Sequence, residues 1–277
     1  MISRHKTRVH IRIDKDARNF IDASGLNTDS NLSVAGLYTA EEARMALHFF
    51  VVGLKSLKDI GQTQTVWERM KAVYVFIGGT ASMHKFNLKD PRDLDAAFRL
   101  VFNSTFTHSG TGALPSSATS IANTYLNPSL NLASQNSLHL SFYSGTNVQN
   151  NFYDISAGAG AFRIYGNGSG FNGGQLSSST FHQIAATNSL GWYGINRINA
   201  TQTTVFKNQT LNTISNTSNV FPNSEVILFG EAIASASSMR ESRLIILGAG
   251  LTDLELSSLF LITNNLQSSL KRNPFYS

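Results

Sequence analysis

The pattern of apolar and polar positions changes once along the chain, near residue 95. Before this point, apolar residues recur every three to four positions, which is typical of amphipathic helices. After it, short apolar or alternating runs are separated by Ser, Asn, Thr and Gly, which is typical of strands joined by turns. We therefore expect an N-terminal arm and helical region over residues 1–95 and a β-rich domain over residues 96–277 that closes with a helix.

Three helix starts carry the same local signal, a Thr followed three residues later by a Glu. In such a capping box the Thr hydroxyl accepts from a first-turn amide, and the Glu carboxylate reaches back to the Thr amide. The pairs are Thr39 with Glu42, Thr65 with Glu68 and Thr252 with Glu255. Two apolar stripes follow, and we expect each to be the buried face of a helix: Ala43, Leu47, Phe50, Val51 and Leu54, then Leu256, Leu259, Phe260, Thr263, Leu266 and Leu270.

The β-rich part is predicted from nine short runs. They cover residues 97–102, 120–126, 138–143, 161–165, 181–185, 191–198, 203–207, 226–229 and 244–247. No stretch with helical periodicity separates them, so a parallel sheet with crossover helices is not expected. Strands at this spacing, with turn residues between them, favour an antiparallel β-sandwich or jelly roll.

Composition limits the classes of protein. The chain has 277 residues, of which 42% are apolar and 14% charged, and it has no cysteine. A disulfide framework and a thiolate zinc site are therefore excluded. The N-terminus lacks the apolar segment of a secretory signal, and no apolar run approaches the ~20 residues that cross a bilayer. We expect a protein made in a cytoplasm, with no membrane span.

The formal net charge of +5 is concentrated at the N-terminus. Four basic residues precede the first acid, Asp14: Arg4, Lys6, Arg8 and Arg12. Val9, Ile11 and Ile13 alternate with polar residues there, which predicts a leading strand or a docking arm. Basic arms can also bind nucleic acid by counterion release. No aromatic residues interleave with these charges, so nucleic-acid binding is not favoured.

No catalytic machinery is visible. The glycine clusters lack the Gly-Lys-Ser/Thr ending of a phosphate-binding loop, and the histidines lack zinc-ligand spacing. A glycosidase usually needs two carboxylates ~5–9.5 Å apart. Between residues 100 and 240 the acids are Asp154, Glu225 and Glu231, each in a different predicted segment. We expect no catalytic residue, no metal ion and no cofactor, and we expect His139 to lie on the polar face of its strand.

Four residues are candidates for sugar binding on a sheet face: Tyr143, Trp192, Tyr193 and Arg197. Trp192 and Tyr193 are adjacent, so they point to opposite faces of a strand and at most one is exposed. The competing interpretation is that these aromatic residues belong to the core of the sandwich.

The segment before the boundary is dense in charges and in residues with special backbone demands. Its notable positions are Gly78, Gly79, His84, Lys85, Asn87, Lys89, Asp90, Arg92, Asp93 and Asp95. The three acids near Pro91 could supply oxygen ligands to calcium. They lack the spacing of a calcium loop, so we interpret the segment as structural, with the acids accepting from backbone amides in a turn and pairing with Lys89 and Arg92.

This segment carries a resemblance to a known family. Phe76-Ile77-Gly78-Gly79-Thr80-Ala81 and residues 84–100 resemble a family of structural proteins of tailed bacteriophages. A second match resembles the closing strands and helix of the concanavalin A-like (laminin-G-like) jelly rolls of that family: Gly191-Trp192-Tyr193-Gly194-Ile195-Asn196-Arg197, Phe206-Lys207-Asn208 and Leu251-Thr252-Asp253-Leu254-Glu255. Asn208-Gln209 replaces the Asn-Gly of a tight hairpin, so we expect a wider or less favourable turn there.

The resemblance implies a mainly β fold: a concanavalin A-like antiparallel β-sandwich with an N-terminal helical and arm region and a C-terminal helix. It also implies a non-enzymatic virion protein, present in several copies or as a homo-oligomer, in a capsid decoration, head fibre or tail or baseplate appendage. The N-terminal region would contact other virion proteins, and the lectin-like sandwich would face host-surface glycans. Two alternatives stay open: a free-standing carbohydrate-binding module or degenerate glycanase, and an assembly protein that binds no ligand.

Overall fold

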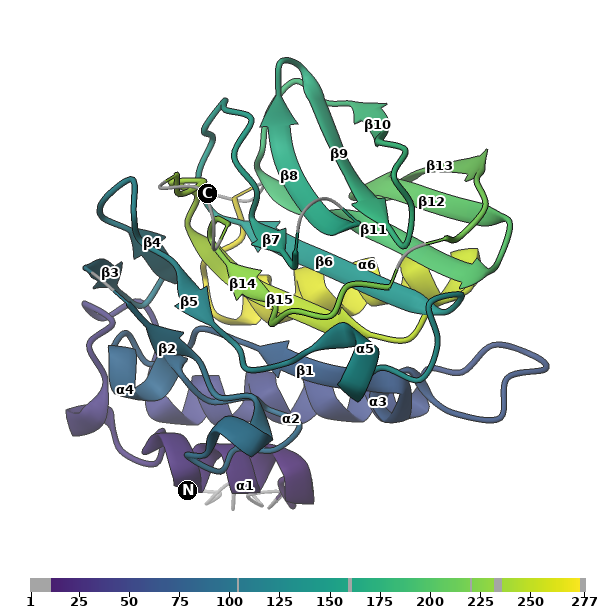
Figure 1. Cartoon of the computed structure of the whole chain (residues 1–277). Helices are drawn as coiled ribbons and strands as arrows, with labels where there is room; N and C mark the ends of the chain where they lie inside the picture. The colour runs from purple at the N-terminus through teal and green to yellow at the C-terminus, as the bar shows by residue number, and fades with distance from the viewer. Residues whose placement is uncertain (1–10, 104, 159–160, 220, 232–235, 275–277) are drawn as a thin grey trace, which may run out of the picture.

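Two antiparallel β-sheets and a layer of helices stack in three layers (Figure 1). The computed structural model describes residues 11–103, 105–158, 161–219, 221–231 and 236–274. We call the middle layer the inner sheet, with strand order β13-β12-β11-β6-β15-β4-β3 and β1 also paired with β15. The outer sheet has the order β10-β9-β8-β7-β14-β5-β2.

The strands of both sheets are short. Those of the inner sheet are β1 (Met70–Tyr74), β3 (Phe106–His108), β4 (Ala113–Pro115), β6 (Leu138–Ser144), β11 (Gly191–Asn199), β12 (Gln202–Lys207), β13 (Thr210–Ser215) and β15 (Ser242–Gly248). Those of the outer sheet are β2 (Val101–Phe102), β5 (Ala122–Asn123), β7 (Ile155–Ser156), β8 (Phe162–Gly168), β9 (Phe171–Leu176), β10 (His182–Ala185) and β14 (Ile227–Leu228). Each of the nine predicted runs overlaps one of these strands, and the predicted β-sandwich is confirmed.

The helices are α1 (Lys15–Ser24), α2 (Ala40–Ser56), α3 (Val66–Arg69), α4 (Ala81–His84), α5 (Pro128–Asn131) and α6 (Asp253–Ser269), with 3₁₀ turns η1 (Asp29–Asn31) and η2 (Asp95–Ala97). All three predicted capping boxes are present, at the starts of α2, α3 and α6. The apolar stripes of α2 and α6 are buried, as predicted. The helical termini of the fold are therefore confirmed.

The inner sheet is buried on both faces because each strand alternates its side chains. On β6, Leu140 and Phe142 point into the core between the two sheets, whereas Tyr143 points into the core beneath the helices. His139 lies on this second face too, fully buried and stacked on Phe206 with ring centroids 5.8 Å apart. The prediction of a polar, solvated face for His139 is wrong because the helices cover that face.

The N-terminal region differs from its prediction. Residues 15–24 form α1, whose start is capped by the Asp14 side chain accepting from the Asp16 amide. Helix α1 buries Ala17 and Phe20 in the same core as α6. Ile11 and Ile13 are not in a strand, and the rest of the predicted arm, residues 1–10, lies outside the described residues.

The boundary near residue 95 does not separate two packed bodies. Strand β1 pairs with β15, with Val73 opposite Ile246, so a strand from the first region completes the inner sheet. The core beneath the helices runs from Ala17 to Leu270. The helical region therefore packs on the sandwich and shares a core with it. Within the described ranges, no helix is long and apolar enough to cross a membrane.

The β12–β13 hairpin is tighter than predicted. Lys207 pairs with Thr210, so Asn208 and Gln209 alone form the turn. Asn208 has φ +54°, a left-handed conformation that Asn adopts more readily than most residues. A two-residue turn is therefore possible here without glycine.

Candidate functional site

The four residues predicted to bind sugar are all inside the protein. Tyr143, Trp192 and Tyr193 have no exposed surface, and Arg197 is 1% exposed. Trp192 and Tyr193 do point to opposite faces of β11, but the helices cover one face and the outer sheet covers the other. These residues belong to the core, which corrects their assignment as a glycan-binding surface.

Two of the four have clear structural roles. Arg197 donates to the carbonyl oxygens of Leu176 (3.1 Å) and Asn216 (2.9 Å), and so joins the inner sheet to β9 of the outer sheet. The Tyr143 hydroxyl donates to Asn264 Oδ1 of α6 at 3.0 Å. Both side chains hold layers together.

The polar residues of the 78–95 segment are used within the fold. Asn87 is the central one: its Oδ1 accepts from the amides of Val73 (2.9 Å) and Lys89 (3.1 Å), and its Nδ2 donates to Ala97 O at 3.1 Å. Lys89 donates to the carbonyl of Trp67 and lies 3.9 Å from the centre of the Trp67 ring. Together these contacts fix the segment to β1.

The acids of this segment form ion pairs; Arg92 is one of the partners, as predicted, whereas Lys89 donates to the Trp67 carbonyl instead. Asp90 pairs with Arg92, Asp93 with Lys85 and Arg99, and Asp95 with Arg99. Their side chains are partly exposed. In the part of the chain that the structure describes, no group of three acidic, His or Cys side chains is arranged to hold a metal ion.

Gly78, Gly79 and His84 shape the turn that leads into α4. Both glycines have positive φ, and Gly79 donates from its amide to His84 Nε2 at 3.2 Å. The other ring nitrogen of His84, Nδ1, lies 2.9 Å from Nδ1 of His108. Burial, and then the His108 charge, lower the pKa of His84 well below its ordinary value, so the pair is neutral at pH 7.

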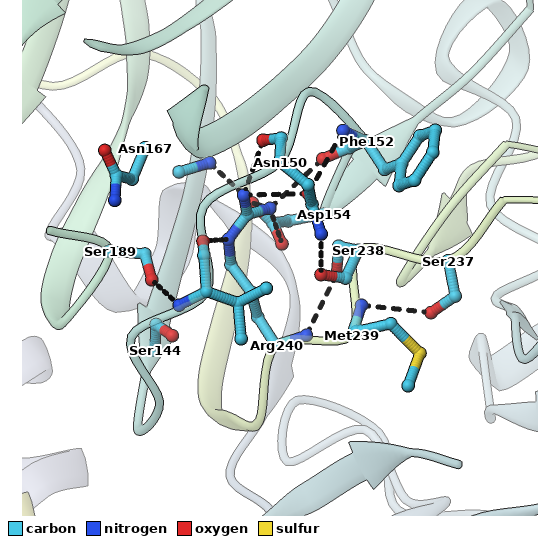
Figure 2. Close-up of polar contacts among 12 residues, drawn as sticks. Ser144, Asn150, Phe152, Asp154, Asn167, Ser189, Ser237, Ser238, Met239 and Arg240 are labelled. Carbon is cyan, nitrogen blue, oxygen red and sulfur yellow. Dashed lines mark hydrogen bonds and ion pairs between the residues drawn. The ribbon is translucent and has the colours of Figure 1, made fainter. Parts of the chain in front are cut away.

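The most enclosed polar cluster of the sandwich is built around Arg240 and Asp154 (Figure 2). Both side chains have no exposed surface, and Arg240 Nη1 lies 3.1 Å from Asp154 Oδ1. Asp154 Oδ2 also accepts from the Tyr193 hydroxyl (2.8 Å) and from the Gly166 amide (2.8 Å). Burial, and then the Asp154 charge, raise the pKa of Tyr193 well above its ordinary value, so this hydroxyl remains a donor.

Arg240 also holds the loop before Asp154 in place. Its guanidinium donates to the carbonyl oxygens of Val148 (3.1 Å), Asn150 (2.8 Å) and Phe152 (3.1 Å) (Figure 2). Alternate residues of the loop therefore turn their carbonyls inward to one cation. Asn151, within this loop, and Tyr153, which follows Phe152, line a hollow at the surface.

That hollow lies over the solvent side of β8, β9 and β10 and has a volume of about 420 Å³. We call it the aromatic hollow, because Tyr153, Tyr165, Phe171 and Phe181 line it together with Asn151, Gly168, Ser169 and Gln183. Cross-strand pairing places Tyr165, Gly173 and Gln183 in one row facing away from the core. Because Gly173 has no side chain, the Phe181 ring can lie over this row. A Cβ added to Gly173 would be 2.9 Å from the Phe181 ring.

The rings of the aromatic hollow are held by one another and by polar partners. Tyr165 and Phe181 stack with ring centroids 5.2 Å apart, and Gln183 Nε2 donates to the Tyr165 hydroxyl at 2.7 Å. The Arg163 guanidinium lies 4.5 Å from the centre of the Tyr153 ring. Phe171 is 41% exposed at the edge. The hollow thus combines fixed apolar rings with hydrogen-bonding groups, the composition of a ligand pocket.

The three acids considered for glycoside hydrolysis each contact different partners. Asp154 is enclosed with Arg240. Glu225 accepts from Asn123 Nδ2 at 2.5 Å, and Glu231 lies 3.4 Å from Arg163. The aromatic hollow has no acid among its lining residues.

Comparison with known proteins gives the fold. No protein-family model matches the sequence, and no curated protein matches it. Trypanosoma rangeli sialidase is similar in structure with a TM-score of 0.54 and 12% identity, over 82% of this chain and 39% of that chain. Its complex with sialic acid gives a TM-score of 0.53 and 11% identity, over 82% and 39%. A third structure is domain 4 of AbnA, a GH43 extracellular arabinanase from Geobacillus stearothermophilus, in complex with arabinotriose. Its TM-score is 0.44 and its sequence identity 14%, over 69% of this chain and 98% of that chain.

The chain therefore spans about two fifths of the length of the sialidase. At such identities the similarity shows a shared β-sandwich fold and nothing about individual residues. The site must be argued from this chain alone.

Sequence reasoning missed the aromatic hollow because its residues come from three separate segments, 151–153, 165–171 and 181–183. A usable signal was present in the run 161–165, where Ile164 is apolar and inward while Arg163 and Tyr165 alternate with it. Nothing in the sequence indicates that Phe181 and Tyr153 meet on the same side.

Proposed function

We propose that the protein is a non-catalytic glycan-binding β-sandwich whose ligand occupies the aromatic hollow. A sugar ring has an apolar face of C–H groups and a rim of hydroxyls, so it suits a surface of fixed aromatic rings bordered by amide and hydroxyl groups. The observation that carries the proposal is the group of rings with exposed surface on the solvent side of the outer sheet, Tyr153, Phe171 and Phe181, with Phe181 stacked on the buried ring of Tyr165.

A non-catalytic role is supported by where the acids lie. Asp154 forms an ion pair with Arg240 and accepts a hydrogen bond from Tyr193. If Asp154 left these contacts to act on a substrate, Arg240 would be a buried cation without its partner. Glu231 is linked to the hollow through Arg163, which pairs with it and lies over the ring of Tyr153. A single carboxylate does not supply the acid and base pair of ordinary glycoside hydrolysis.

We also propose that the protein is displayed on a bacteriophage virion in several copies, as a capsid decoration, head fibre or tail or baseplate appendage. The resemblance of residues 76–100 to phage structural proteins supports this. The helical layer adds support, since it lies on the side of the sandwich away from the outer sheet (Figure 1). Four apolar side chains of α2 and α6 are exposed there and could contact other virion proteins: Phe49, Val52, Leu254 and Leu261.

A glycan-array screen of the whole chain tests the binding proposal. Phe171→Ala removes an exposed ring of the aromatic hollow, and Phe49→Ala removes an exposed ring on α2 as the matched control. We expect selective binding that Phe171→Ala weakens at least ten-fold and Phe49→Ala leaves unchanged. Equal effects of the two variants, or no binding by a folded protein, would contradict it.

A phage-particle experiment tests the location. We expect the chain in purified particles, detected by mass spectrometry, and we expect deletion of residues 1–10 to reduce its incorporation. A protein found only in the free fraction would instead be a free-standing carbohydrate-binding module.

A further inference from the structure

A second hollow, of about 500 Å³, lies on the other side of the turn that joins β8 to β9. Asn167 at the end of β8 and Gly170 of the turn line it, whereas Gly168 and Ser169 line the aromatic hollow. The two hollows therefore share one short turn as their common wall. We call the second one the lysine hollow, because Lys207 is the charged residue among those that line it.

The cation of Lys207 has no acidic partner. Its Nζ donates to the carbonyl of Leu190 and lies 5.1 Å from the centre of the Tyr193 ring. Throughout the described ranges, no carboxylate lies within ion-pair distance of it. Asp154, the acid whose charge acts on it, is already engaged by Arg240.

An ammonium group that is largely withdrawn from water without an anion is unfavourable. Burial, and then the Arg240 charge, lower the pKa of Lys207 to about 7, far below the usual value for a lysine. An anion that entered the hollow would supply the missing charge. It would bind best below pH 7, where Lys207 is protonated.

The neutral groups around Lys207 favour an anion as well. Asn208 Oδ1 accepts from the Trp192 amide at 3.0 Å, and Asn188 Oδ1 accepts from the Leu190 amide at 3.1 Å. Each oxygen already accepts one backbone amide, and each Nδ2 group has two N–H donors, of which Asn188 directs one to Thr187 Oγ1 at 3.5 Å, so both side chains have an N–H to offer a ligand. A cation with amide donors beside it matches the oxygens of a carboxylate.

We propose that the lysine hollow binds the carboxylate of an acidic sugar, so that the glycan recognised by this protein is anionic. The inference rests on the proposed glycan binding in the adjacent aromatic hollow. One sugar residue packs on the rings, and the carboxylate of the same or a neighbouring residue passes the β8–β9 turn to reach Lys207.

The test uses a panel of acidic oligosaccharides (galacturonate, glucuronate and sialate types) with their carboxyl-reduced counterparts, at 0.15 M salt so that general attraction to the net positive chain is screened. Lys207→Met is compared with Lys58→Met, which removes the same charge from an exposed loop position. We expect an acidic member to bind at least ten-fold more tightly than its reduced form. This preference should be lost in Lys207→Met, kept in Lys58→Met, and weakened between pH 6 and pH 8.5.

The outcomes separate the two proposals. Binding of reduced and acidic members with equal affinity, or an acid preference that survives in Lys207→Met, overturns the inference and leaves the proposed function standing. Binding of no member by a protein with a normal melting temperature overturns both. Circular dichroism and the melting temperature of each variant show that the fold is intact.

Discussion

Arg240 and Asp154 lie side by side within the sandwich, with 3.1 Å between Nη1 and Oδ1 and no exposed surface on either side chain. The pair connects the core to the two hollows, because the same guanidinium fixes the loop whose outer residues line both of them. Removing one partner leaves the other charge buried without compensation.

Asp154→Asn should therefore lower the free energy of unfolding by roughly 3–5 kcal/mol. Asp93→Asn is the control, because Asp93 is 45% exposed and its ion pairs should contribute less than about 1 kcal/mol. Urea denaturation of both variants measures the difference. Similar losses in the two variants would show that the buried pair has no special weight.

Gly79→Ala should cost roughly 2–5 kcal/mol. Gly79 has φ +83°, and an added Cβ would lie 2.0 Å from the carbonyl oxygen of Ser33, so both backbone strain and overlap result. Gly36→Ala separates the two effects: its φ is +76°, but no atom lies within 4 Å of the added Cβ, so about 1–2 kcal/mol is expected. Thermal or urea unfolding tests this, and equal costs would disprove the overlap at Gly79.

Stability should fall as the pH drops from 6.5 towards 4. Burial lowers the pKa of His108 to about 4, and the pKa of His84 is also lowered, so in this range the unfolded chain takes up protons that the folded protein does not. Each such histidine contributes up to about 1.4 kcal/mol per pH unit. Urea titrations at pH 7.5, 6 and 5 measure this slope.

His108→Gln should show a shallower slope over the same range. His84 Nε2 accepts from the Gly79 amide, so the proton of neutral His84 is on Nδ1. The glutamine side chain keeps an acceptor for this Nδ1–H group, but it cannot titrate. An unchanged slope in this variant would show that the His84–His108 pair is not the source of the acid sensitivity.

Lys207→Met should raise stability at pH 7 by roughly 1–4 kcal/mol, because the folded protein no longer holds a buried cation whose pKa is lowered to about 7. In the parent protein the unfolded chain binds more protons between pH 7 and 10.5, so stability rises with pH there. That component of the rise should be absent from Lys207→Met and present in Lys58→Met. A destabilised Lys207→Met would mean that the lysine is held by contacts that outweigh its desolvation.

The sequence predicted those parts of the fold that depend on local signals. The Thr–Glu pairs located α2, α3 and α6, since capping groups and the residues they cap are close in sequence. Helix α1 was missed because alternation at Ile11 and Ile13 suggested a strand. Strand β9 was missed because Gly173 and Gly174 interrupt its apolar pattern.

The candidate site depends on contacts that no local pattern encodes. Alternation on β11 correctly put Trp192 and Tyr193 on opposite faces, but whether a face meets water depends on the helices that cover it. The aromatic hollow needs Tyr153, Tyr165 and Phe181 to converge from a loop and two hairpins. Lys207 ends the predicted run 203–207, and only the packed structure shows its burial.

The pairing of β1 with β15 joins residues 70–74 to residues 245–248. During synthesis, the emerging chain cannot complete the inner sheet until residues 245–248 have left the ribosome. Strands made earlier must wait with unpaired edges, and contacts of such long sequence separation form slowly. We expect the nascent protein to depend on chaperones until β15 and α6 have been made.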